Sequence, residues 1–356
     1  LVELYDHAAR IIADARAITV PAQLLISGSD WVVRHGPQHE FFVNLASPAK
    51  ERHVLPGFFH DTLGERERRK ALDLIKPFLE RQFALALLSP RGLYWAMSRA
   101  SIRMGAWLSS GMKTGIATGF DSGSTLDYVY ENEARGHGPL GRMIDRTFLD
   151  AIGWRGIRQR KLHLEELIGS ATRTLKAGRP VHIVDIAAGH GRYVLDAVAK
   201  CTEPPASVRL QDFSDLNVSL GCKLIAERHL PTSVSFHQAD AFDAQMLAGL
   251  DPAPDLAIVS GLYELFADNA MIARSLGGLA KAMQPGSLLL YTNQPWHPQL
   301  EMIARSLTSH RGGQAWVMRR RTQGEMDQLV AAAGFEKLDQ RIDQWGIFTV
   351  SIARRV

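Results

Sequence analysis

Three short segments of the sequence place carboxylates and small residues directly after apolar runs. The first, VHIVDIAAGHGRYVLDAV, leads from an apolar run to Asp185 and then into the small-residue loop AAGHG at residues 187–191. Small residues let a ligand approach the backbone, and a helix that follows such a loop offers unpaired N–H groups at its N-terminus. The same pattern also occurs as a tight strand-to-helix turn and in nucleotide-binding domains, so it needs supporting signals.

Two further carboxylates follow the next two apolar segments. Asp212 stands at the end of the apolar part of VRLQDFSD, where an acidic side chain can accept hydrogen bonds from ribose hydroxyls. Asp240 and Ala241 follow SVSFHQ, where a carboxylate can accept an adenine amino group and an apolar neighbour can cover the ring. The three segments in this order predict a site for a ligand that contains adenosine.

Polar side chains also follow the fourth and fifth apolar segments. VSGLYELF places Tyr263 and Glu264, and TNQPWHPQ places His297, at the carboxyl edge where open α/β sheets bind their ligands. We expect Tyr263 or Glu264 to contact a substrate and His297 to serve as a general base. The structural alternatives are that Tyr263 packs in the core, Glu264 caps a helix and His297 holds a turn.

Two clusters of arginine beside tryptophan lie at residues 154–160 and 316–321. Planar guanidinium groups bind carboxylates and phosphates, so an anionic substrate is one expectation, and solvated faces or ion pairs are the alternative. No long basic face accompanies the clusters, and we expect no nucleic-acid binding.

The order of these motifs resembles class I S-adenosylmethionine-dependent methyltransferases over residues 171–356. The resemblance implies S-adenosyl-L-methionine as the cofactor. On the family's pattern Asp185 orients the methionine portion and Asp212 binds the ribose, while Asp240 and Ala241 bind the adenine.

In the glycine loop the same resemblance holds at two of three positions. Gly189 and Gly191 keep the family's pattern and would line the cofactor, whereas Ala187 stands where the family usually has glycine.

The chain also resembles a narrower family, the bacterial methyltransferases fused behind α/β-hydrolase domains. The segments that carry this resemblance are GRMIDRTFLDAIGWRGIRQRKLHLEEL, NQPWHPQLEMIAR and WVMRRRTQGEMDQLV. It covers roughly residues 125–356 and does not name a substrate. We expect a small-molecule or lipid-related acceptor, the lipid class by analogy with the fused hydrolase domain alone.

The first 88 residues resemble the C-terminal end of an α/β-hydrolase of the monoacylglycerol lipase and serine aminopeptidase type. VPAQLLISGSDWVV and VLPGFFHDTLGE place Asp30 and His60 at the triad acid and base. The nucleophile of that family precedes both, and the sequence contains no G-x-S-x-G elbow, so the nucleophile and the missing hydrolase strands are expected upstream. An esterase or lipase, or a non-catalytic module that binds S-adenosylmethionine, are therefore the alternative functions.

From residue 181 onward, predicted strands and helices alternate regularly, and these elements must position the residues named above. Strands are predicted at 181–186, 207–212, 233–237, 255–260 and 287–292, with a helix at 322–333 and a closing antiparallel pair near 335–340 and 346–353. This pattern predicts a doubly wound, Rossmann-like α/β sheet of seven strands. We expect a hydrolase remnant over 1–88, a linker over 89–138, a helical cap over 139–176 and the methyltransferase domain over 177–356.

Composition limits the other possibilities. The 356 residues are 46% hydrophobic and 22% charged, as in a globular protein, with a net charge of +4. No apolar run approaches the roughly 20 residues of a membrane span. Cys201 and Cys222 form no zinc motif, so no metal site and a reducing cytoplasm are expected. The chain begins at Leu1 without a leader, which predicts a piece of a longer protein.

Overall fold

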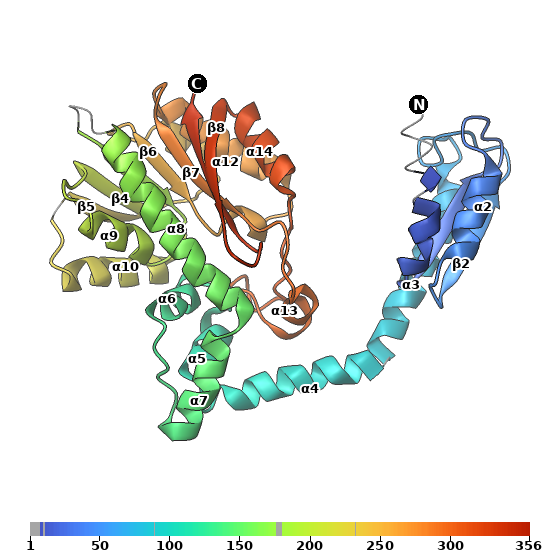
Figure 1. Cartoon of the computed structure of the whole chain (residues 1–356), viewed down its shortest axis with the longest axis horizontal. Helices are drawn as coiled ribbons and strands as arrows, with labels where there is room; N and C mark the ends of the chain where they lie inside the picture. Colours follow the sequence, from blue (N-terminus) through green and yellow to red (C-terminus); the bar gives the residue numbers. More distant parts are fainter. Residues whose placement is uncertain (1–7, 10, 89, 176–179, 232) are drawn as a thin grey trace. The chain divides into compact units, whose positions relative to one another are not determined.

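The computed structural model describes residues 8–9, 11–88, 90–175, 180–231 and 233–356. The chain forms two compact units, Leu1–Tyr94 and Trp95–Val356, each with its own sheet (Figure 1). In the part of the chain that is described, no helix combines the length and the apolarity needed to cross a membrane.

The first unit is a small parallel α/β arrangement. Strands β1 (Ala22–Ser27) and β2 (Lys50–Leu55) pair in parallel, and η1 (Ala15–Ala17), α2 (His35–Asn44) and α3 (Arg68–Leu88) complete the unit. Among the described residues, its buried cluster comprises Leu55, Phe58 and Ala71, with Leu25 and Leu74 packed against it.

The second unit is built on a seven-stranded sheet of order β5-β4-β3-β6-β7-β9-β8. The first five of these pair in parallel, and β9 pairs antiparallel with both β7 and β8. This confirms the predicted doubly wound sheet and its closing hairpin. The strands are β3 (His182–Ile186), β4 (Ser207–Asp212), β5 (Val234–Gln238), β6 (Leu256–Val259), β7 (Leu288–Asn293), β8 (Phe335–Ile342) and β9 (Thr349–Arg355).

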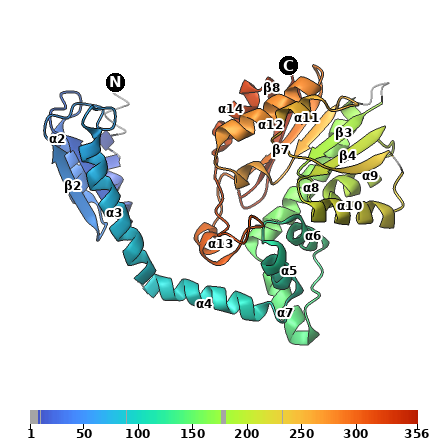
Figure 2. The same ribbon diagram turned by 180° about the vertical axis from the view of Figure 1, so that it is seen from behind.

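Helices cover both faces of this sheet because successive strand residues point to opposite sides. In β6, Leu256 and Ile258 pack with α8 (Ile152–Leu175) and α9 (Arg192–Ala199), whereas Ala257 and Val259 pack on the other face. Figure 1 shows α8 across the first face, and Figure 2 shows the second from behind. The second face carries α11 (Ala244–Ala248), α12 (Asn269–Ala282) and α14 (Gln323–Ala332); α10 (Asp215–Glu227) and α13 (Leu300–Ser306) complete the unit.

The region expected to be a linker, 89–138, is instead helical. It contains α4 (Pro90–Gly105), α5 (Ser110–Thr118) and α6 (Gly123–Glu131), and α7 (Gly138–Leu149) follows. The small polar residues that suggested a loop act as helix caps: Ser109 accepts a hydrogen bond from the Met112 N–H and Ser122 from the Thr125 N–H.

Glycine in α5 serves packing rather than flexibility. A Cβ on Gly111 would lie 2.5 Å from the Phe148 ring, and one on Gly115 would lie 2.5 Å from the Phe120 ring. Together these helices and α8 form a third apolar cluster, against which Trp316, Ile347 and Phe348 also pack. Residues 110–149 therefore belong to the second unit's core.

Candidate active site

A cavity of about 930 Å³ lies at the carboxyl ends of β3, β4 and β5. Such an edge is where open α/β sheets bind ligands. The structure brings six of the seven expected cofactor residues together in its lining: Ala187, Gly189, Gly191, Asp212, Asp240 and Ala241.

The loop after β3 depends on left-handed backbone conformations. Gly189 and Gly191 have φ of 61° and 75°, and a Cβ on Gly191 would lie 2.4 Å from the Leu210 side chain. Ala187 adopts the same conformation with φ of 58°. For an L-residue this costs about 1–2 kcal/mol, so the alanine retains the geometry of the expected glycine at an energetic cost.

Asp212 organises the loop as well as lining the cavity. Its Oδ2 accepts a hydrogen bond from the Gly189 N–H at 2.9 Å, and its Oδ1 accepts from the Ser214 N–H and the Asn217 amide, both at 2.9 Å. A carboxylate oxygen accepts two hydrogen bonds, so Oδ2 retains capacity for a ligand hydroxyl.

Asp185 lies beneath the loop rather than in the cavity lining. It is fully buried, and its Oδ2 accepts a 2.6 Å hydrogen bond from the hydroxyl of Tyr193, which does line the cavity. Burial raises the pKa of Asp185 well above its usual range. Its Oδ1 has no partner among the described residues, which leaves one buried acceptor available to a ligand or a water.

The adenine end of the expected site carries aromatic residues that were not predicted from the sequence. Asp240 is exposed, and its Oδ1 accepts from the Phe242 N–H at 2.9 Å. Phe213, which directly follows Asp212, lines the cavity while its side chain is 74% exposed. An exposed aromatic ring beside a binding cavity is available to stack on a flat ligand, and its position next to Asp212 was the signal that could have identified it.

Helix α6 closes the cavity through an ionic contact with the glycine loop. Asp127 accepts hydrogen bonds from the Arg192 guanidinium at 2.5 and 2.7 Å and lies 3.3 Å from His190 Nδ1. Burial opposes ionisation of Asp127, but the hydrogen bonds from Arg192 and His190 outweigh it and lower the pKa to about 2. The helix therefore belongs to the site, although the sequence placed it in a linker.

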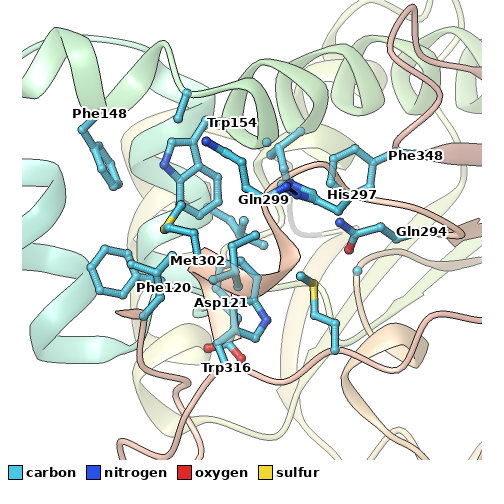
Figure 3. A pocket seen from close by; sticks show the side chains of 18 of the residues that line it. Phe120, Asp121, Phe148, Trp154, Gln294, His297, Gln299, Met302, Trp316 and Phe348 are labelled. Atoms are coloured by element: carbon cyan, nitrogen blue, oxygen red, sulfur yellow. Dashed lines mark hydrogen bonds between the residues drawn. The ribbon is translucent and has the colours of Figure 1, made fainter. Parts of the chain in front are cut away.

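A second cavity of about 680 Å³ adjoins the first (Figure 3). Its wall is mainly aromatic and thioether: the Trp154 and Trp316 rings stack with centroids 6.1 Å apart and planes 21° apart. The polar side chains Gln294, His297 and Gln299 also line it. The other large apolar residues of the wall are Met112, Phe120, Phe148, Met302, Met318 and Phe348.

The two cavities share part of their lining at a buried ion pair. Arg160 lines both, and its Nη1 lies 3.4 Å from Glu264 Oε1 while its guanidinium packs 5.1 Å from the Phe348 ring centre. Burial raises the pKa of Glu264, although Arg160 opposes this. Glu264 Oε2 has no partner among the described residues. The other shared residues are Asp121, Leu126, Gly261 and Leu265.

His297 is held in one tautomer by its own turn. Its Nδ1 accepts a 3.0 Å hydrogen bond from the Gln299 N–H, so the proton is on Nε2. Burial lowers the pKa of His297 to about 4, which keeps the ring neutral near pH 7. The ring therefore offers an N–H donor to the second cavity rather than the basic nitrogen expected from the sequence.

Tyr263 lies away from both cavities. It begins the short turn η2 (Tyr263–Leu265), which directs its ring into the core, and its hydroxyl lies 2.9 Å from Ser275 Oγ. Burial raises its pKa above the usual range. This placement gives no support to the expectation that Tyr263 contacts a substrate. Tyr263 instead packs in the core, which was the structural alternative. Glu264, the next residue, faces the second cavity.

In the two arginine–tryptophan clusters, several arginines bind backbone carbonyls rather than facing a cavity. Buried Arg321 donates to the Tyr263 and Phe266 carbonyls at 2.7 and 2.8 Å, so it holds the segment after β6. Arg158 donates to the Leu149 carbonyl at 2.8 Å. These guanidinium groups are therefore engaged by the protein itself.

In the first unit the two expected triad residues are in contact. His60 Nδ1 lies 3.2 Å from Asp30 Oδ2, and Asp30 Oδ1 accepts from the Val32 and Val33 N–H groups at 2.8 and 3.0 Å. The turn thus orients the carboxylate toward the imidazole. This is the arrangement that a hydrolytic base requires.

Comparison with known proteins finds one similar sequence and several similar structures. The Escherichia coli protein YnbC is 51% identical over 384 residues; the chain is covered fully and spans 65% of that relative. Among solved structures, magnesium protoporphyrin IX methyltransferase from Synechocystis is 13% identical, with a TM-score of 0.48, covering 68% of this chain and 99% of the other. A methyltransferase from Methanosarcina mazei is 17% identical, with a TM-score of 0.40, covering 53% and 97%.

Two family models match the sequence directly. One described as "Serine aminopeptidase, S33" matches residues 1–67, in agreement with the hydrolase-like first unit. The other, described as "Putative methyltransferase", matches residues 69–355, most of the chain. The mostly parallel seven-stranded sheet and its closing antiparallel hairpin agree with the class I methyltransferase resemblance of the sequence. The chain therefore belongs to this methyltransferase family and is a class I methyltransferase.

Proposed function

We propose that the second unit transfers a methyl group from S-adenosyl-L-methionine to a small-molecule or lipid-related acceptor. The observation that carries the proposal is the pair of adjoining cavities with a common lining at Arg160 and Gly261. The first cavity has the carboxylates and the glycine loop suited to an adenosine-containing cofactor. The second has the size and apolar wall of a small-molecule site.

The residues fit the cofactor in three respects. Asp212 Oδ2 has acceptor capacity for a ribose hydroxyl, and Asp240 has an exposed carboxylate for the adenine edge. The unpartnered Oδ1 of Asp185 and the hydroxyl of Tyr193 lie at the methionine end of the glycine loop. Gly189 leaves room beside the backbone of Gly123, since an added Cβ would be 3.3 Å from its Cα. These are the proposed cofactor residues, with Ala187, Gly191 and Ala241 completing the lining.

Methyl transfer requires alignment above all. When bound, S-adenosylmethionine supplies an electrophilic methyl carbon, and the acceptor's lone pair displaces the neutral thioether. We propose that Glu264 takes the proton if the acceptor atom carries one, because its Oε2 is unpartnered beside the junction. His297 then positions the acceptor through its Nε2–H.

Calorimetric titration of S-adenosylmethionine and S-adenosylhomocysteine into the chain tests the cofactor site. Phe213→Ala removes an exposed ring and should weaken binding about tenfold, as the loss of one aromatic contact implies. Leu338→Ala, a similarly exposed apolar truncation on β8, is the matched control and should change nothing. Absence of micromolar binding by the unaltered chain would leave the proposal without its cofactor.

A second candidate function, an esterase or lipase activity, is favoured by the Asp30–His60 contact. This activity also needs a nucleophilic serine that precedes Asp30 in a longer protein, so it concerns the longer protein only. In a longer chain with those residues, an upstream serine should react with a fluorophosphonate, and His60→Ala should reduce the labelling rate at least a hundredfold. His53→Ala, on β2, is the control; equal labelling of both variants would exclude the dyad.

A further inference from the structure

We infer that the second cavity selects an uncharged acceptor with a flat apolar ring system and one edge that accepts hydrogen bonds. Its role as the acceptor site rests on the proposed methyltransferase function. The selectivity itself follows from the side chains of the cavity, none of which the comparisons assign to a ligand.

The wall of the cavity favours flat rings. Trp154 and Trp316 stack on each other, and Trp154 also contacts Phe148 with ring centres 5.6 Å apart. Phe120 lies 6.3 Å from Phe148, so four aromatic rings form a continuous buried surface (Figure 3). Aromatic pairs contribute more than their buried area alone, and the flexible thioethers of Met112 and Met302 can adapt to the ligand outline.

Two of the three carboxylates in the lining, Asp121 and Asp150, are already engaged within the protein. Asp121 accepts from Ser309 Oγ and the His310 N–H, both at 2.6 Å, and lies 3.1 Å from the His310 ring. Asp150 lies 3.2 Å from Arg146.

The cation of the lining, Arg160, is the partner of Glu264. An anionic acceptor would enter beside three carboxylates and compete for this guanidinium. Burying a charge without a partner is costly, so the cavity disfavours the anionic acceptor suggested by the arginine clusters.

One edge of the cavity is polar and not engaged. Gln294 and His297 are each only 4% exposed, yet the Gln294 amide makes no hydrogen bond to any described residue and the His297 Nε2–H is available (Figure 3). Both residues line the cavity, so their N–H groups are available to a ligand. Two N–H donors from the segment after β7 match a carbonyl, ether or hydroxyl oxygen on the acceptor.

A matched pair of fluorescent probes tests this selectivity in the complete chain. 1-Anilinonaphthalene and 8-anilinonaphthalene-1-sulfonate share one ring skeleton and differ by a sulfonate. We expect the neutral probe to bind at least tenfold more tightly, and saturating S-adenosylmethionine to leave it bound. Equal affinity for the sulfonated probe, or displacement of the neutral probe by S-adenosylmethionine, would overturn the inference.

Substitution of Gln299 gives the selectivity a sharper test. Gln299 lines the cavity and is partly exposed, so Gln299→Lys adds a cation at little cost to folding. It should tighten binding of the sulfonated probe about tenfold, whereas Gln299→Met, neutral and of similar length, should preserve the preference for the neutral probe. No change with Gln299→Lys would place the sulfonated probe elsewhere and contradict the inference.

Separate titration of S-adenosylmethionine distinguishes the two proposals. If the cofactor fails to bind while the probe preference holds, the methyltransferase proposal fails and the cavity's selectivity stands. If the cofactor binds while the sulfonated probe binds as well as the neutral one, only the inference on the acceptor fails.

Discussion

His297 shows how burial and a single backbone contact change the role of a residue. The sequence suggested a general base because a histidine near pH 7 is the usual one. In the structure the Gln299 N–H occupies the Nδ1 lone pair, and burial lowers the pKa to about 4. A ring in this state donates through Nε2, so any pH dependence of methyl transfer near pH 6.5 should have another source.

The neutral state of His297 has a consequence for stability. The pKa is about 4 when folded and about 6.5 when unfolded, so between these values the unfolded chain binds a proton that the folded chain does not. The free energy of unfolding should therefore fall as the pH is lowered from 6.5 to 4, by up to about 3 kcal/mol from this residue.

Urea unfolding at pH 7.5 and pH 4.5 can measure the effect. His297→Gln has no titrating group at this position, so its stability should decline less between the two pH values than that of the unaltered chain. The comparison at pH 7.5, where the histidine is neutral in both states, serves as the control. Identical pH dependence in the two proteins would show that His297 ionises freely when folded.

At the scale of elements, the strands of the second unit were predictable because their signals are local. Six of the seven lie within two residues of the predicted bounds, and β9 begins three residues after its predicted start; fully apolar runs such as LAIV in β6 (Leu256–Val259) helped the prediction. Strand ends also predicted that Asp212 and Asp240 would lie close together, because the carboxyl ends of parallel strands converge at one edge.

Helices α5 and α6 were not predictable from their own sequence. Short helices of this kind gain their stability from tertiary contacts rather than from propensity. One contact is buried Asp145, which accepts hydrogen bonds from Ser109 Oγ and the Gly111 N–H at 2.5 and 2.9 Å and from the Tyr128 hydroxyl. These partners lie far apart in sequence, so no local pattern reveals them.

The second cavity could not be predicted from the sequence for the same reason. Its lining comes from helices α4 to α8, from the segments after β6 and β7, and from the β8–β9 connection, so its shape exists only in the folded unit. The residue type alone also does not predict in which direction a side chain in a turn will point. Tyr263 and Glu264 are neighbours, yet η2 sends the first into the core and the second toward the cavity.

At the scale of the whole molecule, the two cavities and the Asp30–His60 dyad lie in different units of the chain. The residues that line the two cavities run from Ser98 to Phe348, all within the second unit. The Asp30–His60 dyad lies in the first unit. Every residue proposed for the methyltransferase site therefore lies within residues 95–356, whereas the proposed hydrolase activity needs a serine in addition to Asp30 and His60.

Removal of residues 1–94 should accordingly leave cofactor binding intact. We expect residues 95–356 to bind S-adenosylmethionine with an affinity within about threefold of the complete chain, because no cavity residue is removed and the three apolar clusters of the second unit remain whole. Calorimetry on the two proteins measures this, and Phe213→Ala in the shorter chain should weaken binding by the same factor as in the complete one. A loss of more than tenfold on truncation, with the shorter chain still folded by circular dichroism, would mean that the first unit contributes to the cofactor site.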